Sequence, residues 1–292
     1  MDIGLALPNT VPGTAGRDLL GWAVEGERAG FSTLGTLDRL VYDNYDCLTV
    51  LAAAAAVTDR IRLATTIMIG PLRTNTALLA KQVATVDRLS GGRLTLGLAA
   101  GARPDDFTAG GASHAGRGRA FAAQLAELRK LWAGERRGHA GGVGPRPTRD
   151  RGPELILGGQ SLAAVTRVAE AADGWISGSG GPGMFRGGAG QVRQVWRAAG
   201  REGTPRLLAL AYFALGDDAD RTAERYVRDY YGFSPPYAQA VLDNAAIGAA
   251  GVARTVEAFR DAGCDELVLA PCSSDVDQVK LLSDAVGDLL HP

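Results

Sequence analysis

Short apolar segments alternate with longer amphipathic segments along most of the chain. The short segments are bounded by Gly, Pro, Asp or Arg, and the longer ones carry apolar residues at three- and four-residue steps. Residues 75–89 are one example, with an apolar stripe made of Leu78, Leu79, Val83 and Val86. A helix with such a stripe packs against a sheet. The alternation therefore predicts repeated βα units around a parallel sheet.

Eight of the short segments are predicted to be strands: residues 3–7, 33–37, 62–68, 94–99, 154–157, 174–177, 207–215 and 266–270. The predicted helices are residues 17–29, 47–57, 75–89, 118–132, 161–172, 190–199, 219–231 with 237–246, 252–262 and 276–290. Eight units are the number that closes a (β/α)8 TIM barrel, which needs about 250 residues. We predict one such α/β domain over residues 1–292. An open doubly wound sheet is the alternative, because alternation alone does not show closure.

Two segments interrupt the regular alternation. Residues 134–152 are rich in Gly, Pro and Arg, which predicts a surface loop between the fourth helix and the fifth strand. Residues 217–250 carry two helical segments where one would suffice. We interpret this second segment as a short insertion in the barrel.

Composition and charge exclude several classes of partner. The formal net charge is -1, so the chain has no basic field to attract nucleic acid or acidic membrane surfaces. The N-terminus lacks the basic start and long apolar stretch of a signal peptide, and we expect a cytoplasmic protein. The three cysteines, Cys47, Cys264 and Cys272, are too few and scattered for a disulfide framework or a paired-cysteine zinc site.

Other barrel chemistries lack their residues. Lys81, Lys130 and Lys280 fall inside predicted helices, so none is placed at a strand end for Schiff-base chemistry. The three histidines, His114, His139 and His291, lie in predicted loops or at the terminus without metal-ligand spacing. We predict no metal centre. A magnesium site formed by Asp38 and Asp106 is the alternative. It is disfavoured, because carboxylates on loops are usually solvated or salt-bridged.

Candidate functional residues follow the strands, because the groups that react in these barrels come from loops at the carboxyl ends of the strands. The candidates are Asp38, Arg39, Tyr42 and Asp43; Thr66, Met68 and Arg73; Arg103, Asp105 and Asp106; Gly158, Gly159, Gln160 and Ser161; Ser177, Gly178 and Ser179; and Cys272. Four other polar or aromatic residues are interpreted as structural rather than functional. Arg117 and Trp132 are interpreted as contributing helix packing and salt bridges, and Asp173 and Trp175 as structural.

The strongest local signal is the segment Gly158-Gly159-Gln160-Ser161, which leads from a predicted strand directly into a helix. Two residues without side chains let backbone N–H groups approach an anion, and Ser161 can cap the helix. Because helix N-termini carry unpaired N–H groups and partial positive charge, a phosphate is well satisfied there. The alternative is a tight βα turn with a serine cap and no ligand. Residues 177–181 offer a second set of donors or a flexible loop.

Nucleotide fingerprints are missing. Residues 97–101 do not form a GxGxxG motif after their strand, and the chain has no GxxxxGK[ST] loop. A nicotinamide cofactor on a Rossmann fold is therefore disfavoured. A barrel with loop glycines and few strand-end catalytic groups suits an enzyme whose cofactor carries the reaction.

Several stretches together resemble the luciferase-like monooxygenase superfamily of flavin- or deazaflavin-dependent oxidoreductases. They are residues 3–8 (IGLALP), 27–31 (ERAGF), 37–39 (LDR), 58–65 (TDRIRLAT), 79–87 (LAKQVATVD), 89–94 (LSGGRL), 128–132, 155–161, 172–175 (ADGW) and 263–269. The resemblance covers most of the chain and is weakest over residues 185–250. It implies a luciferase-like TIM barrel that binds reduced flavin (FMN) or a deazaflavin (coenzyme F-420) at its C-terminal mouth.

The resemblance also implies site residues. The family's non-prolyl cis peptide, which bulges from the third strand behind the cofactor ring, falls at or near Thr66-Ile67. Its phosphate loop corresponds to Gly158, Gly159 and Ser161, and we assign Gln160, Ser177 and Gly178 to the same cofactor site. It further implies a homodimer and a separate reductase that supplies the reduced cofactor.

Departures from the family pattern leave the chemistry open. The second strand is followed by Asp38-Arg39 where many members have Asp-His, so a histidine proton donor is absent. Deazaflavin sugar-phosphate dehydrogenases have a glutamate where this chain has Ala102, and a tryptophan near Tyr42. Residues 185–250 are short compared with the luciferases, which leaves little lid over the site.

The resulting hypothesis is an oxidoreductase that performs monooxygenation or hydride transfer on a small-molecule substrate. Asp38, Arg39 and Tyr42 are the predicted catalytic residues, which orient the substrate, with Arg39 holding a carboxylate or oxyanion. Arg103, Asp106 and Cys272 are predicted to line the substrate pocket, although a small buried thiol is the alternative role for Cys272. A non-catalytic flavin-binding or sensor protein on the same fold is the alternative function.

Overall fold

The computed structural model describes residues 1–290, so His291 lies outside the described residues. Eight main strands form a parallel sheet: β1 (Asp2–Ala6), β2 (Thr33–Thr36), β3 (Arg62–Thr65), β5 (Leu94–Ala99), β6 (Glu154–Gly158), β7 (Gly174–Ser177), β8 (Arg206–Ala214) and β10 (Glu266–Pro271). The last strand, β10, pairs with both β8 and β1, which closes the barrel. The predicted TIM barrel is confirmed, and the open sheet is wrong.

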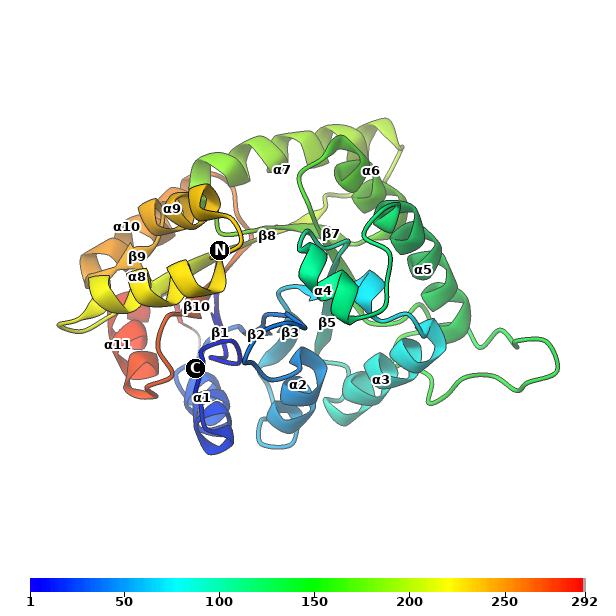
Figure 1. The fold of residues 1–292 in the computed structure, drawn as a ribbon, viewed down its shortest axis with the longest axis horizontal. Helices are drawn as coiled ribbons and strands as arrows, with labels where there is room; N and C mark the ends of the chain where they lie inside the picture. Colours follow the sequence, from blue (N-terminus) through cyan, green and yellow to red (C-terminus); the bar gives the residue numbers. More distant parts are fainter. Residues whose placement is uncertain (291–292) are drawn as a thin grey trace.

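Helices surround the strands (Figure 1). They are α1 (Gly16–Arg28), α2 (Cys47–Ala55), α3 (Thr76–Leu89), α5 (Arg117–Trp132), α6 (Leu162–Ala171), α7 (Gly181–Ala198), α8 (Ala219–Tyr230), α9 (Pro235–Asp243), α10 (Gly248–Asp261) and α11 (Asp277–Val286). Short 3-10 turns occur at Gly70–Leu72 and Gly287–Leu289. None of the helices among residues 1–290 is long and apolar enough to cross a bilayer.

Two helices differ from the predicted pattern. Helix α4 (Pro104–Ala109) is a short extra helix after β5, and α7 begins at Gly181 rather than at residue 190. The glycines of α7 weaken any local helix signal, but Phe185 is fully buried against Trp175, with ring centroids 5.9 Å apart. Packing therefore stabilises a turn of helix that propensity disfavours.

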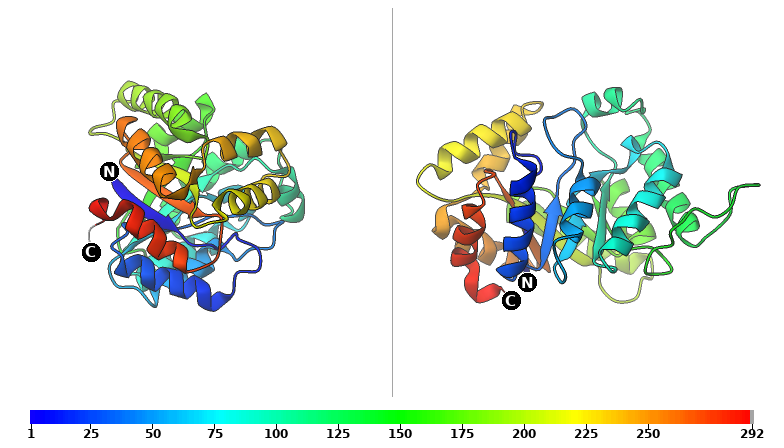
Figure 2. Two further views of the ribbon diagram at one scale, coloured as in Figure 1. Left: turned by 90° about the vertical axis from the view of Figure 1, so that its left-hand side faces the viewer. Right: turned by 90° about the horizontal axis from the view of Figure 1, so that it is seen from below.

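Two further strands of two residues each extend the sheet. After Thr65 the chain leaves its ladder with β5 and rejoins it at β4 (Met68–Ile69), while β9 (Ala246–Ile247) pairs with β8. Residues 134–152 contain no helix or strand and extend away from the barrel (Figure 1). Figure 2, right, places α4 and α8 at one end of the barrel and both termini at the other.

A polar network closes the end of the barrel at which the strands begin. The carboxylate of Glu266 is 1% exposed and accepts hydrogen bonds from Thr33 Oγ1 at 2.6 Å and from Arg62 Nη2 at 3.0 Å. It also binds Arg206, which in turn pairs with Glu154. Because these residues stand at the starts of five strands, the network joins strands far apart in sequence.

Candidate active site

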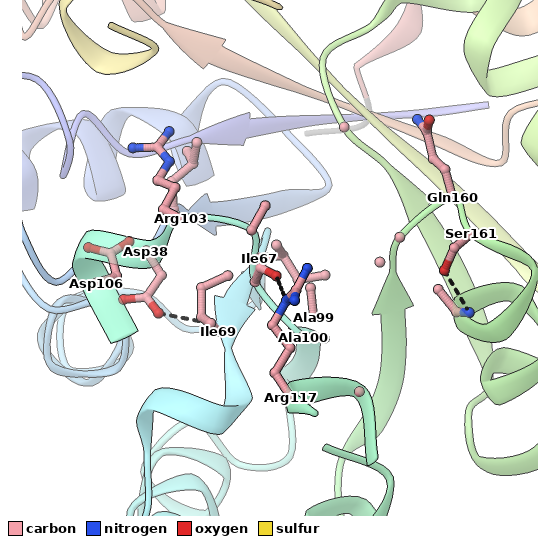
Figure 3. A pocket seen from close by; sticks show the side chains of 18 of the residues that line it. Asp38, Ile67, Ile69, Ala99, Ala100, Arg103, Asp106, Arg117, Gln160 and Ser161 are labelled. Carbon is pink, nitrogen blue, oxygen red and sulfur yellow. Dashed lines mark hydrogen bonds between the residues drawn. The ribbon is translucent and has the colours of Figure 1, made fainter. Parts of the chain in front are cut away.

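A cavity of about 840 Å³ opens where the strands end. Its wall is formed by the segments after β2, β3, β5, β6 and β7, together with residues from the α8–α9 region. Cavities of this size enclose small organic ligands and cofactors. Figure 3 shows Asp38, Asp106 and Arg103 on one side of the cavity and Gln160 and Ser161 on the other.

The turn between β6 and α6 forms one end of the cavity, lined by Gly158, Gly159, Gln160 and Ser161. Ser161 is the N-cap of α6, and its Oγ accepts a hydrogen bond from Ala164 N at 3.3 Å. Gly159 has φ +121°, and a Cβ there would lie 2.8 Å from the Cβ of Ala164. Only glycine fits this position without strain. The first N–H groups of α6 have no partner within the helix, so the turn can hold a phosphate.

A buried tryptophan holds the carbonyl of Gly159 through a hydrogen bond. Trp175 Nε1 donates a hydrogen bond to Gly159 O at 2.8 Å, and the Trp175 side chain is fully buried. This contact holds the turn in its glycine-specific conformation. Trp175 therefore has the structural role predicted from the sequence.

Two arginines that the sequence analysis did not assign to the site line the same region of the cavity. Arg117 Nε donates to Gly101 O at 2.7 Å, and Arg167 Nη2 donates to Gly118 O at 3.1 Å (Figure 3 shows Arg117). Burial lowers the pKa of Arg167, and its Nε atom is buried without a hydrogen-bond partner. The packing and salt-bridge role predicted for Arg117 is wrong, since its guanidinium lines the cavity and bonds to carbonyls. Its place at the start of α5 was the available signal.

The bulge after β3 forms the back of the cavity. Thr66 N donates to Thr36 O at 2.7 Å, and Ile67 lines the cavity and packs on Ile156, Ile176 and Leu208. Within residues 1–290 the only cis peptide precedes Pro145, so the expected cis bond at Thr66-Ile67 is wrong. The bulge consists of trans peptides, and the Thr66 N–H is bonded to β2.

Asp38 lies in the cavity wall but is fully engaged by the protein. Its carboxylate forms a two-pronged ion pair with Arg73, including Nη2 to Oδ1 at 2.9 Å, and accepts from Ile69 N at 2.9 Å. Burial lowers the pKa of Arg73, but the Asp38 charge and hydrogen bond outweigh it and raise that pKa. Arg73 also contacts Asp46 and Cys47, so a cation already occupies this acidic cluster.

Asp106 is similarly occupied. Its Oδ1 accepts from Leu40 N at 3.0 Å and Val41 N at 2.7 Å, and Arg39 Nε lies 3.9 Å from Oδ2. Asp38 and Asp106 both line the cavity, yet each already has hydrogen-bonding partners within the protein. Asp38 is paired at both oxygens, whereas Oδ2 of Asp106 has only Arg39 nearby.

Arg39 and Tyr42 lie outside the cavity lining. Arg39 Nη2 binds Asp105 at 2.8 Å, and its guanidinium packs on the rings of Tyr42 and Tyr230 at 5.1 and 5.8 Å. The Tyr42 hydroxyl donates to Asp229, and burial together with this carboxylate raises the pKa of Tyr42. Both side chains therefore connect the loop after β2 to α4 and α8 beside the cavity.

The α8–α9 region contributes an aromatic wall that the sequence analysis did not anticipate. Tyr230, Tyr231, Phe233 and Tyr237 line the cavity, and Tyr231 shares hydrogen bonds with Tyr212 and Ser179 at 3.0 and 3.3 Å. Although short, the insertion therefore covers one side of the cavity. The dense spacing of aromatic residues between positions 226 and 237 was the signal for it.

Of the remaining predicted site residues, one lines the cavity and two do not. Gly178 lines the cavity, whereas the Ser177 side chain is fully buried and donates to Gly178 O at 3.2 Å. Cys272 is 2% exposed and packs among Tyr212, Tyr226 and other residues of a separate buried cluster. The structure therefore places Cys272 behind the cavity wall.

The burial of Cys47, Cys264 and Cys272 predicts inert thiols. Burial raises the pKa of all three, that of Cys264 to about 12, so each is protonated near neutral pH and reacts slowly. We expect native protein to react with a chromogenic disulfide reagent far more slowly than denatured protein, in which all three thiols react. Fast reaction of Cys272 in native protein would contradict its position behind the wall.

The chain belongs to the luciferase-like monooxygenase family, whose model matches residues 1–279. Among relatives, the uncharacterised protein Rv0953c of Mycobacterium tuberculosis is 31% identical over 182 residues, which are 60% of this chain and 64% of that protein. The chain thus aligns with under two thirds of that relative's length.

Two further relatives have names that state a cofactor. An F420-dependent glucose-6-phosphate dehydrogenase of Beutenbergia cavernae is 35% identical over 42% of this chain and 39% of that protein. An FMNH(2)-dependent dimethylsulfone monooxygenase of Pseudomonas putida is 24% identical over 67% of this chain and 56% of that protein. These are the two cofactors that the sequence resemblance left open.

Solved structures share the whole fold. An F420-dependent secondary alcohol dehydrogenase in complex with an F420-acetone adduct superposes with a TM-score of 0.84 at 16% identity, covering 99% of each chain. The monooxygenase RslO1 from Streptomyces bottropensis gives 0.77 at 21% identity, also over 99% of each chain. At these identities the similarity establishes the fold alone.

Proposed function

We propose that the protein is an oxidoreductase that binds reduced FMN or reduced coenzyme F-420 in the cavity and acts on a small organic molecule. The observation that carries the proposal is the glycine turn Gly158–Ser161, placed at one end of an 840 Å³ cavity at the carboxyl ends of the strands. Both cofactors carry a phosphate that such a turn suits. When bound, either cofactor would supply a hydride, and reduced FMN would also supply electrons for the reduction of dioxygen.

The residues present fit such a cofactor. The start of α6 offers backbone N–H groups, and Arg117 and Arg167 add two positive charges without a carboxylate partner in the described residues. At the back of the cavity, Ile67 presents an apolar surface on which a planar ring can lie. The aromatic wall from α8 and α9 excludes water from the other side.

The names of the relatives support both cofactors equally, and no residue of the cavity discriminates between them. Under this proposal the partners are a small-molecule substrate and a separate reductase that delivers the reduced cofactor. The protein thus needs no reductase site of its own.

Cofactor titration tests the proposal. FMN and F-420, each oxidised and reduced, are titrated into purified protein to high micromolar concentration, with cofactor fluorescence and calorimetry as readouts. We expect one of them to bind with one equivalent per chain. Failure of both cofactors to bind would refute the proposal. Substrate turnover with the bound reduced cofactor separates an enzyme from a sensor.

A further inference from the structure

We propose that Arg103 is the binding group for an organic carboxylate, which makes the substrate an anion with an apolar, planar body. The inference rests on the proposed function in one respect: the Gly158–Ser161 end of the cavity is taken by the cofactor, so Arg103 serves the second ligand. It assigns the substrate class to a particular side chain and a particular end of the cavity.

The charges that line the cavity favour an anion. Five charged residues line it: Asp38, Arg103, Asp106, Arg117 and Arg167. Both carboxylates are compensated, Asp38 by Arg73 and Asp106 by two backbone N–H groups and Arg39. Within residues 1–290, none of the three arginines pairs with a carboxylate. The cavity therefore presents uncompensated positive charge.

Arg103 differs from the other two arginines in its place and surroundings. Arg117 hydrogen-bonds to the carbonyls of Gly101 and His114, and Arg167 to that of Gly118. Arg103 lies across the cavity from Ser161 (Figure 3), and its guanidinium packs on Phe233, Tyr230 and Tyr231 at 4.3, 4.5 and 5.4 Å from the ring centroids. The aromatic rings hold the guanidinium in place, and no hydrogen bond joins it to them.

Arg103 donates no side-chain hydrogen bond within residues 1–290, and one of its donors is buried. Its Nη1 atom is buried and has no hydrogen-bond partner, and a buried unpaired donor is unfavourable. A ligand carboxylate can supply the missing acceptor through a charge-assisted, two-pronged hydrogen bond to the guanidinium.

Arg39 shows what a purely structural arginine looks like in the same neighbourhood. It also packs on Tyr230, but its guanidinium pairs with Asp105 at 2.8 Å and lies outside the cavity lining. The role in holding an anion that the sequence suggested for Arg39 therefore falls to Arg103. The neighbouring rings of Tyr230, Tyr231, Phe233 and Tyr237 suit an apolar, planar ligand body.

Benzoate and benzamide are matched probes, since they share a ring and shape but differ in charge. Each is titrated calorimetrically into wild type, Arg103→Gln and Arg103→Lys, with and without the oxidised cofactor identified above. The control is Arg225→Gln, which removes an exposed arginine on α8 outside the cavity lining. We expect wild type and R225Q to prefer benzoate, and R103Q to lose at least about tenfold in benzoate affinity.

Benzamide affinity and cofactor affinity should be unchanged in R103Q, and R103K should retain part of the preference for benzoate. Thermal unfolding of each variant identifies a folding defect, and R103K then carries the test. Equal binding of benzoate and benzamide to wild type, no benzoate binding at millimolar concentration, or unchanged benzoate affinity in R103Q would each overturn the inference. Loss of cofactor affinity in R103Q would assign Arg103 to the cofactor, overturning the inference but leaving the proposed function intact.

Discussion

Replacing Gly159 with valine is expected to weaken binding of the cofactor by about 100-fold or more. Gly159 has φ +121°, and a Cβ would lie 2.8 Å from Ala164 Cβ, so valine forces the turn into another conformation. Each charge-assisted hydrogen bond to a phosphate contributes about 1.5–3 kcal/mol, and losing two of them accounts for the expected change. The measurement is the dissociation constant of FMN or F-420 by fluorescence titration.

The control for this variant is Gly200→Val. Gly200 also has a positive φ, +66°, but a Cβ there meets nothing within 4 Å, and the residue is exposed after α7. The G200V variant therefore strains the backbone without changing the Gly158–Ser161 turn. We expect G200V to bind the cofactor as wild type does, even where its stability falls. Equal affinity of G159V and wild type would show that the phosphate lies elsewhere.

Replacing Glu266 with glutamine is expected to destabilise the barrel by about 3 kcal/mol, the lower end of the range for a broken buried ion pair, because Arg62 keeps Asp2 and Arg206 keeps Glu154 as a partner. Glu266 is 1% exposed and pairs with both Arg62 and Arg206. For a chain of this size the loss corresponds to a fall in Tm of roughly 10 °C. Thermal unfolding followed by circular dichroism measures it.

An exposed ion pair supplies the matched control. Glu224 binds Arg228 one turn away on α8, with both side chains more than half exposed, so Glu224→Gln should change stability by about 0.5 kcal/mol or less. Because Glu266 stands at the opposite end of the barrel from the cavity, E266Q should leave cofactor affinity unaltered at temperatures where it is folded. Stability of E266Q equal to that of E224Q would contradict the network.

The fold was accessible from the sequence because the period of apolar residues reports which faces are buried. The stripe in residues 75–89 and the short apolar strands each reflect local geometry that a chain segment carries by itself. Leu79, Val83 and Val86 are buried as predicted, whereas Leu78 is 50% exposed and lies outside the stripe. The same holds for the glycine turn before α6, where residue type and position restrict the backbone directly. The start of α7 was predicted too late in the sequence because its glycines carry no such signal, and packing of Phe185 on Trp175 and Phe259 stabilises it.

The site residues that follow strands could be predicted from the sequence, whereas those on helices could not. Asp38, Arg103, Asp106 and Gly158–Ser161 were found because they follow strands, and the barrel gathers strand ends around one cavity. Arg117 and Arg167 were not found, since they lie on helices whose first turns reach the cavity only after the barrel closes. The trans peptide at Thr66-Ile67 could not be predicted from residue type and spacing, because hydrogen bonds from other strands decide the path of the bulge.

The sequence by itself determined the alternating βα units, the glycine turn and the set of polar residues at the strand ends, since these follow from local periodicity and residue type. Closure of the barrel was decided by the tertiary structure, in which β10 pairs with both β8 and β1. Only the tertiary structure decided which arginine is free. Arg39 and Arg103 are equivalent in type and both follow strands, but Asp105 and Asp106 neutralise one while three aromatic rings surround the other. A side chain's charge is fixed by its chemistry, whereas its availability depends on partners that only folding brings within reach.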